Sequence, residues 1–208
     1  MTKEHQAKRG MLVVLSGPSG VGKGTIVHRY LAQHPDVKLS VSGTTRPPRE
    51  GEGQGIHYYF YTQEEFKAEI EADGMLEYAY YRDNYYGTPK RFVEEVLAEG
   101  GTIILEIEVE GAGQIREIYP DALFVFVVPP SFAVLGERLQ KRATESGEAI
   151  AKRLAVAKEE MKRAGDYDYI IVNDQVERAA DCLDAVIKAK GCTLPYQTKF
   201  IEEVLENA

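Results

Sequence analysis

The sequence predicts an α/β fold whose core is a doubly wound, mostly parallel sheet. Short apolar runs alternate with amphipathic helical stretches along most of the chain, and a glycine-rich loop joins the first run to the first helix. Strands joined through helices need crossover connections, which produce parallel sheets covered by helices on both faces. The loop therefore lies at the carboxyl edge of the sheet, where open α/β sheets bind ligands.

The strands that we expect are the apolar runs at residues 11–16, 37–41, 102–107, 123–128 and 169–172. The helices between and after them carry apolar residues at helical spacing. They are expected at residues 22–33, 111–118, 132–142 and 176–188.

Two segments break this alternation. Residues 42–89 contain short alternating runs, such as 56–61 and 75–80, and one helical stretch at 63–71, so we expect an inserted subdomain with a mixed sheet. Residues 143–148 form a polar bridge between two arginine-bearing helices and predict a lid. The expected single domain of residues 1–208 thus has its core at about 10–41, 90–136 and 164–190, the insert at about 42–89 and the lid at about 137–163.

The composition limits the partners that we expect. With 44% hydrophobic residues, a chain of 208 residues can bury a core of ordinary size. The net charge of −8 argues against duplex nucleic acid, because binding its phosphate backbone needs a broad basic surface. The first ten residues contain no apolar segment, and the longest apolar run, 122–128, is too short to span a bilayer. We therefore expect a soluble, cytoplasmic protein without a nucleic-acid or membrane partner.

The C-terminal part contains both cysteines, Cys182 and Cys192, and no pattern beside them suggests a metal site. We expect free thiols. Residues 192–208 fit either an ordered helix or a frayed tail, and the sequence leaves the oligomeric state open.

The glycine-rich loop carries most of the functional prediction. It reads GPSGVGKGT and consists of Gly17, Pro18, Ser19, Gly20, Val21, Gly22, Lys23, Gly24 and Thr25. In this pattern backbone N–H groups and the following helix N-terminus bind an anion, and the lysine contacts the β- and γ-phosphates. A solvated lysine in a glycine turn is the alternative, but the flanking strand and helix favour phosphate binding. Gly24 stands where the usual motif has the Ser or Thr that ligates magnesium, so Thr25 is the nearest hydroxyl.

A second candidate anion site lies in the insert. Arg46 and Arg49 flank Pro47 and Pro48, and the prolines restrict the backbone so that the guanidinium groups lose less entropy on binding. The planar guanidinium suits phosphate oxygens. A solvated charged loop is the alternative, and the upstream phosphate loop favours the anion site. Most of the 13 tyrosines also lie in the insert, where strand packing explains the majority of them.

Three glutamates lie at strand positions. Glu77 interrupts an apolar run, where considered alone it is expected to face solvent. If it points into a pocket instead, its oxygens can accept hydrogen bonds from N1–H and the amino group of guanine, a donor pair that adenine lacks. Glu106 and Glu108 end an apolar strand with a period of two, so we expect them on one face. Carboxylates that face a triphosphate normally imply magnesium between them.

Arginines bracket the predicted lid. Arg138 and Arg142 are four residues apart and share a helix face, and Arg153 begins the next helix. Closure of the lid would bring their charge to a transferring phosphoryl group and exclude water. A basic helix surface is the alternative, and it better describes neighbouring lysines such as Lys141.

In its motifs the chain resembles the guanylate kinases, from about Gly10 to about Leu183. The stretches that carry the resemblance are GPSGVGKGT (17–25), SGTTRPPREGE (42–52), HYYF (57–60), LEYA (76–79), NYYGT (84–88), LEIEVEGA (105–112), VPPS (128–131), ERLQKR (137–142) and YIIVND (169–174). The resemblance implies the P-loop nucleoside monophosphate kinase fold, with a GMP-binding insert and a helical lid. It also implies transfer of the ATP γ-phosphoryl group to GMP, with Mg²⁺.

The resemblance also implies individual roles. On the GMP side it implies Arg46, Arg49, Tyr58 and Tyr86 at the phosphate, Glu77, Ser42 and Thr88 at the guanine, and Glu52, Glu106 and Glu108 nearby. On the ATP side it implies residues 17–25, Asn173 near the adenine, and Arg138, Arg142 and Arg153. Lys23, Arg46 and the three lid arginines are the expected catalytic groups, and Thr25 and Glu106 are the candidate magnesium ligands.

Three positions depart from the usual family pattern. Glu108 and His57 each replace an Asp, and Ala143 replaces a Gly. Glu108 is one methylene longer than the Asp that it replaces, and Ala143 would stiffen the lid hinge. None of these changes removes a charge that phosphoryl transfer needs.

Two other functions stay open. The first is a guanylate-kinase-like protein-binding module that has lost catalysis, which retention of Lys23 and the lid arginines disfavours. The second is a related kinase for another phosphorylated acceptor, such as a ribose phosphate, which Glu77 and the hydroxyls of Ser42 and Thr88 disfavour.

Overall fold

The computed structural model of the protein describes residues 9–81, 83–142 and 147–207. Its central sheet has five strands in the order β2 (Lys38–Leu39), β7 (Thr102–Glu106), β1 (Met11–Ser16), β8 (Leu123–Val128) and β9 (Tyr169–Val172). Every pairing in it is parallel, and Val13 in the middle strand lies between Ile104 of β7 and Leu123 of β8. The predicted parallel core is confirmed.

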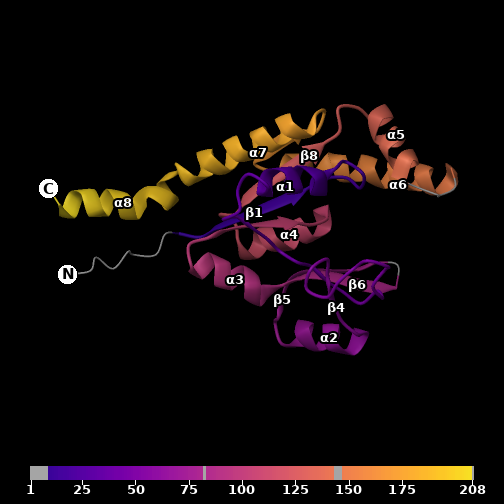
Figure 1. The fold of residues 1–208 in the computed structure, drawn as a ribbon, viewed down its shortest axis with the longest axis horizontal. Coiled ribbons are helices and arrows are strands. Elements are labelled where there is room, and N and C mark those ends of the chain that lie inside the picture. Colours follow the sequence, from indigo (N-terminus) through magenta and orange to yellow (C-terminus); the bar gives the residue numbers. More distant parts are fainter. Residues whose placement is uncertain (1–8, 82, 143–146, 208) are drawn as a thin grey trace.

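Helices cover both faces of this sheet (Figure 1). They are α1 (Lys23–Leu31) and α7 (Val176–Gly191) on one face, and α3 (Lys90–Ala98) and α4 (Val109–Ile118) on the other. Val13 belongs to the apolar cluster of Ile26 and Leu183, whereas the adjacent Leu12 belongs to that of Val93. Both faces of β1 are buried, which explains why its sequence is continuously apolar.

The insert is a second, mixed sheet, as predicted. Its strands, in spatial order, are β4 (Tyr59–Phe60), β3 (Gly43–Thr44), β6 (Asn84–Pro89) and β5 (Met75–Tyr81). β3 runs parallel to β4 and antiparallel to β6. The helix α2 (Gln63–Glu71) begins at a capping box formed by Thr62 and Glu65, and its Phe66 is fully buried. β6 and α3 have no counterpart among the predicted elements, because glycine and proline weaken the strand pattern and no polar loop separates the two.

The apolar run at 56–61 forms a strand only at Tyr59–Phe60. Gly55 has a φ of 69°, a left-handed conformation that favours glycine, and the following Ile56 is 74% exposed. The side chain of Gln54 accepts a 2.7 Å hydrogen bond from the N–H of Phe60. The chain therefore turns before β4 rather than extending the strand.

A helix pair lies between β8 and β9, consisting of α5 (Phe132–Arg142) and α6 (Gly147–Met161), and the 3₁₀ helix η1 (Lys162–Asp166) follows it. Leu135 and Leu139 of α5 and Ala157 of α6 are fully buried and form a small apolar core of their own. Most of the predicted polar bridge at 143–148, including Ala143, lies outside the described residues, and its last two residues begin α6.

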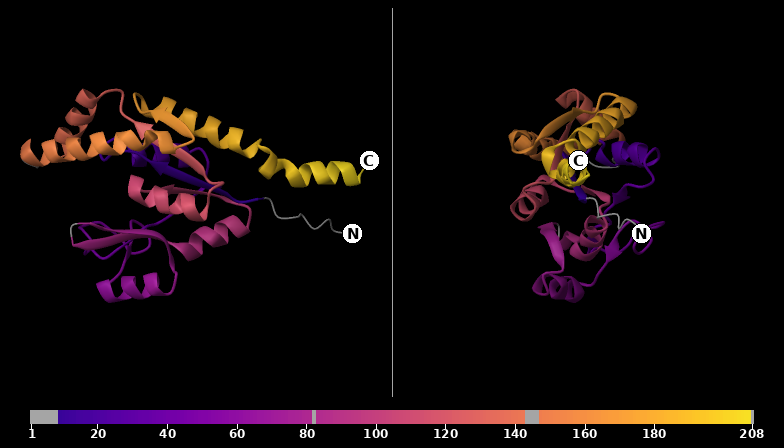
Figure 2. Two further views of the ribbon diagram at one scale, coloured as in Figure 1. Left: turned by 180° about the vertical axis from the view of Figure 1, so that it is seen from behind. Right: turned by 90° about the vertical axis from the view of Figure 1, so that its left-hand side faces the viewer.

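The helix α8 (Leu194–Glu206) extends beyond α7, away from the rest of the molecule (Figure 2). Of the two possibilities for this segment, the helix is therefore the one observed. None of its residues is buried. The cysteines Cys182 and Cys192 are free thiols, as predicted. Within the described ranges, no helix combines the length and apolar character that a membrane span requires.

Candidate active site

The phosphate loop runs from the end of β1 to the start of α1 and surrounds Lys23. This lysine is 8% exposed, and its Nζ donates a 2.6 Å hydrogen bond to the carbonyl oxygen of Gly17. Gly22 has a φ of 98°, and a Cβ there would lie 2.5 Å from Nδ2 of Asn173. The loop can therefore approach Asn173 only because this position is glycine.

Two carboxylates lie beside Lys23. Glu106 ends β7, and a Cβ added at Gly24 would lie 3.3 Å from its Oε2. Burial raises the pKa of Glu106, and the charge of Lys23 opposes this rise. Glu108 precedes α4, its side chain is 67% exposed, and its Oε2 is 3.9 Å from Nζ of Lys23. The strand ends before Glu108, so the two glutamates are not on one strand face as predicted. Glu108 still forms an ion pair with Lys23, and the charge of Lys23 acts on Glu106.

The two predicted magnesium ligands lie in different surroundings. Glu106 is beside the loop, whereas Thr25 is exposed on α1. Among the described residues, no group of three or more His, Cys, Asp or Glu side chains could hold a metal ion. One carboxylate near a phosphate loop still fits Mg²⁺, which often takes only one or two protein carboxylates together with substrate phosphates and water.

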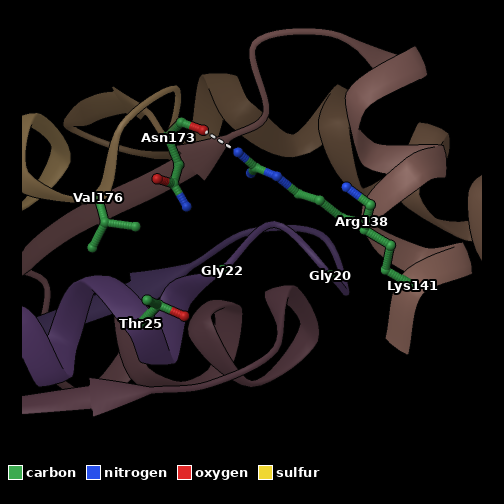
Figure 3. A pocket seen from close by; sticks show the side chains of 7 residues that line it. All are labelled: Gly20, Gly22, Thr25, Arg138, Lys141, Asn173 and Val176. Atoms are coloured by element: carbon green, nitrogen blue, oxygen red, sulfur yellow. Dashed lines mark hydrogen bonds between the residues drawn. The ribbon is translucent and has the colours of Figure 1, made fainter. Parts of the chain in front are cut away.

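A cavity of about 290 Å³ opens beside the loop (Figure 3). It is lined by Gly20, Gly22, Thr25, Arg138, Lys141, Asn173 and Val176. Arg138 donates hydrogen bonds to the carbonyl oxygens of Val21 (3.1 Å) and Asn173 (2.8 Å), and Nδ2 of Asn173 donates to that of Val21 (2.8 Å). The sequence analysis assigned Lys141 to a basic helix surface, whereas it lines this cavity, and it did not single out Val176 as a site residue. Lys141 lies one helical turn after Arg138, and that spacing could have identified it.

The other two predicted lid arginines are Arg153 on α6 and Arg142 at the end of α5. Nη2 of Arg153 on α6 donates a 2.8 Å hydrogen bond to Oγ of Ser19. Arg142 ends α5, and its side chain lies outside the described part of the chain. Arg138 and Arg153 therefore both contact the phosphate loop.

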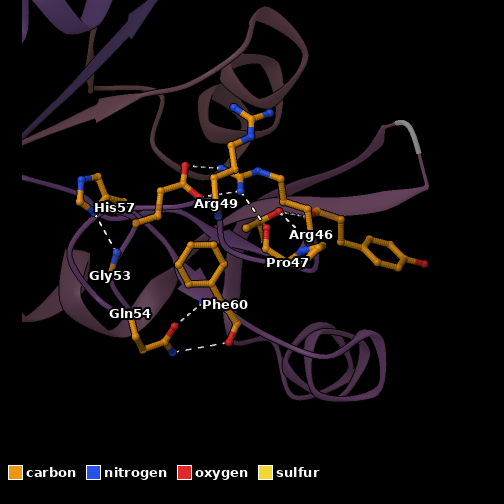
Figure 4. Close-up of polar contacts among 10 residues, drawn as sticks. Arg46, Pro47, Arg49, Gly53, Gln54, His57 and Phe60 are labelled. Carbon is orange, nitrogen blue, oxygen red and sulfur yellow. Dashed lines mark hydrogen bonds and ion pairs between the residues drawn. The ribbon is translucent and has the colours of Figure 1, made fainter.

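In the insert, Arg46 is held by Glu52 (Figure 4). Two hydrogen bonds of 2.7 Å join the guanidinium to the carboxylate, and the guanidinium lies 5.0 Å from the centre of the Tyr58 ring. The rings of Tyr58 and Tyr86 are 6.4 Å apart. The hydrogen bonds from Arg46 and from the N–H of Arg49 lower the pKa of Glu52 to about 2. The side chain of Arg49 is exposed.

Glu77 is buried, so the expectation that it faces solvent is wrong. A β-bulge between Met75 and Glu77 breaks the alternation of β5, and three successive side chains are buried. Oε1 of Glu77 accepts a 2.7 Å hydrogen bond from the hydroxyl of Thr88, and a Cβ at Gly111 would lie 2.4 Å from Oε2. The pKa of Glu77 is raised to about 7. Burial is the main cause, the hydrogen bond from Thr88 opposes it, and the charge of Glu108 adds to the rise.

The predicted acceptor residues of the insert thus form two groups. The first consists of Arg46, Glu52, Tyr58 and Tyr86, and the second of Glu77 and Thr88. Ser42 precedes β3, is half-buried, and its carbonyl oxygen accepts a 2.8 Å hydrogen bond from the N–H of Tyr59. Glu108 connects the second group with the phosphate loop, because its charge acts on both Glu77 and Lys23.

The family model for guanylate kinase matches residues 9–190. The chain belongs to the guanylate kinase family. It is 49% identical to the guanylate kinase of Desulfitobacterium hafniense (strain Y51) over 194 residues, which cover 92% of this chain and 97% of that one. It is 50% identical to the guanylate kinase of Symbiobacterium thermophilum over 199 residues, which cover 95% and 94%.

A solved structure agrees with this assignment. The crystal structure of guanylate kinase from Anaplasma phagocytophilum superimposes with a TM-score of 0.75 at 30% identity, and the match covers 91% of this chain and 90% of that one. The resemblance identified from the motifs and the predicted P-loop kinase fold are both confirmed. The family model ends before α8, whereas the match to the Symbiobacterium thermophilum guanylate kinase covers 95% of this chain and so extends into that helix.

Proposed function

We propose that this guanylate kinase transfers the γ-phosphoryl group of ATP to GMP and so forms ADP and GDP. The observation that carries the proposal is the position of Glu108. Its carboxylate is 3.9 Å from Lys23 in the phosphate loop, and its charge also acts on Glu77 in the insert. Glu108 also directly precedes α4, the helix whose Gly111 packs against the Glu77 carboxylate, so the phosphate loop and the carboxylate suited to guanine lie on either side of the start of one helix. Transfer between two nucleotides requires this proximity.

On the donor side, the backbone N–H groups of residues 17–25 bind the phosphates of ATP, and Lys23 adds a point charge. Arg138, Arg142 and Arg153 stabilise the charge that spreads over the transferring group. The helix pair α5–α6 acts as the lid that brings these arginines in and excludes water. The cavity beside Asn173 takes the adenine, an assignment that the cavity's place next to the loop supports.

On the acceptor side, Arg46, Arg49, Tyr58 and Tyr86 hold the GMP phosphate in line with the γ-phosphate. Glu77 accepts hydrogen bonds from N1–H and the amino group of guanine, and the hydroxyls of Ser42 and Thr88 complete the base site. The attacking group is a phosphate oxygen of GMP, which is already ionised. No general base is therefore needed.

Mg²⁺ would be held at Glu106, with Thr25 as the second candidate and Glu108 nearby. When bound, it supplies positive charge that offsets the charge of the phosphates during transfer. Burial raises the pKa of the Glu106 carboxyl because it disfavours the charged form. A cation that binds together with the nucleotide would favour that charged form.

We also propose the domain division that the sequence suggests. The protein acts as one domain in the cytoplasm, with a GMP-binding insert at about 42–89 and a lid at about 137–163. The separate mixed sheet and the separate apolar core of α5 and α6 support this division.

The proposal is tested by following ADP formation from ATP while GMP, AMP, CMP and UMP are titrated in turn. We expect GMP to have by far the highest kcat/KM. A protein-binding module would form no ADP with any of the four, and a kinase for another acceptor would show no preference for GMP. Either result would contradict the proposal.

A further inference from the structure

The helix α4 contacts the strand β5 of the insert and lies between the insert and the central sheet (Figure 1). Glu108, Gly111 and Gln114 follow one another along it at intervals of three positions, so successive members of this row are neighbours on the helix surface. Glu108 pairs with Lys23, and Gly111 packs against the carboxylate of Glu77. Gln114 is the member of the row to which the proposed reaction assigns no role.

Gln114 binds the backbone of β5 through two hydrogen bonds. Its Oε1 accepts a 3.1 Å hydrogen bond from the N–H of Tyr78, and its Nε2 donates a 2.9 Å hydrogen bond to the carbonyl oxygen of the same residue. β5 is an edge strand of the insert sheet, with β6 on one side only. The glutamine amide offers the same donor and acceptor as a peptide group. It therefore takes the place of a neighbouring strand at Tyr78.

This contact directly follows the residue on which the proposed base site depends. Glu77 precedes Tyr78 in β5, and the β-bulge between Met75 and Glu77 interrupts the regular pairing with β6. Pairing with β6 therefore fixes the backbone around Glu77 less firmly than it would in a regular strand. Gln114 adds two hydrogen bonds at the open edge, so α4 holds both the carboxylate of Glu77 and the peptide groups of the next residue.

We propose that Gln114 is a positioning residue of the acceptor site, which fixes Tyr78 to α4 and so sets where the carboxylate of Glu77 lies relative to the phosphate loop. The helix starts directly after Glu108, beside Lys23, so a strand that is fixed to this helix is also fixed relative to the loop. Without Gln114, β5 moves more freely, and Glu77 meets the guanine edge less often while the GMP phosphate is in line for transfer. The role in guanine binding rests on the proposed kinase function, whereas the fixing of β5 does not.

Amide hydrogen exchange, followed by NMR in the full-length, nucleotide-free protein, tests whether β5 is fixed to α4. Tyr80 lies two positions after Tyr78, so by the alternation of an antiparallel strand its N–H faces the same edge. In the wild type, the amide of Tyr78 should exchange at least about tenfold more slowly than that of Tyr80. This comparison needs no variant, and equal rates would overturn the proposal.

Gln114→Met tests the two hydrogen bonds, because methionine keeps the length of the side chain and can make neither of them. We expect the amide of Tyr78 to exchange roughly tenfold faster in this variant than in the wild type. The matched control is Glu117→Met, at an exposed position on the same helix, which should exchange like the wild type. An unchanged Tyr78 rate in Gln114→Met, or an equal rise in Glu117→Met, would show that Gln114 does not hold the strand.

Ligand affinity tests the role of Gln114 at the acceptor site. By calorimetry, Kd for GMP should rise roughly tenfold in Gln114→Met, while Kd for a non-hydrolysable ATP analogue stays within about twofold. The ratio of kcat/KM for GMP to that for AMP should also fall roughly tenfold, because a less firmly held Glu77 discriminates less between the bases. A purely structural residue would lower the melting temperature and change both affinities alike, or neither, and either result would overturn the proposal.

Failure of the proposed kinase function would give a different set of results. The wild type would then bind no GMP, while the slow exchange of the Tyr78 amide and its acceleration in Gln114→Met would remain. Failure of the proposal itself would leave GMP binding to the wild type intact and show no difference in exchange or in GMP affinity between Gln114→Met and Glu117→Met.

Discussion

Glu52 holds the guanidinium of Arg46 through two hydrogen bonds of 2.7 Å, and one of its oxygens also accepts a 2.8 Å hydrogen bond from the N–H of Arg49. The pKa of Glu52 is lowered to about 2, so the ion pair persists throughout the neutral pH range. Arg46 is thereby kept beside Tyr58. Such preorganisation lowers the entropy that a side chain loses when it binds a phosphate.

Glu52→Ala should therefore weaken GMP binding. We expect KM for GMP to rise roughly tenfold, with KM for ATP within about twofold, because Arg46 is no longer held in place. Steady-state kinetics with each nucleotide varied in turn measures both values. Glu50→Ala, at an exposed neighbouring position, is the control and should leave both constants unchanged. An equal rise of both constants in Glu52→Ala would count against a specific role in the acceptor site.

Gly111→Ala should disturb the part of the acceptor site that contains Glu77. The new Cβ would lie 2.4 Å from Oε2 of Glu77, so the carboxylate has to move. We expect at least a tenfold rise in KM for GMP and a lower melting temperature, as a clash in a packed site usually costs about 1–3 kcal/mol. Gly113→Ala is the matched control on the same helix, because nothing lies within 4 Å of its Cβ. If both variants behave alike, Glu77 does not pack as described.

The buried Glu77 carboxyl predicts a pH-dependent stability. Its pKa is raised from 4.5 to about 7, so the folded state holds a proton that the unfolded state has lost between these values. The free energy of unfolding of the wild type minus that of Glu77→Gln should be greatest below about pH 4.5. This difference should decrease as the pH rises to about 7 and stay constant at higher pH. Urea unfolding of both proteins from pH 5 to about 8 measures the difference. A difference that stays constant, or grows with pH, would contradict the raised pKa.

Lys23→Ala should remove most of the catalysis and leave the fold intact. Lys23 is buried in the loop and supplies charge where it develops on the phosphates, so kcat should fall by roughly 10²-fold or more. Far-UV circular dichroism checks the fold. Lys67→Ala, at an exposed position on α2, should retain full activity. A loss of kcat below about tenfold in Lys23→Ala would be incompatible with this role.

The parts of the site that could be predicted from the sequence are those with local patterns. The loop of residues 17–25 has its strand, glycines and helix in one continuous stretch, and the arginines of α5 recur at helical spacing. The burial of Glu77 could not be predicted, because it depends on a bulge between paired strands and on the approach of α4 at Gly111.

The central claim is that Glu77 selects guanine, and the ratio of kcat/KM for GMP to that for AMP tests it most directly. A site built to pair with hydrogen-bond donors rejects an analogue that lacks them by a factor on the order of 10⁴. We predict a ratio of that order in the wild type and a fall of at least about 100-fold in Glu77→Gln, with KM for ATP unchanged. A wild-type ratio near one, or a ratio that Glu77→Gln leaves unchanged, would contradict the account.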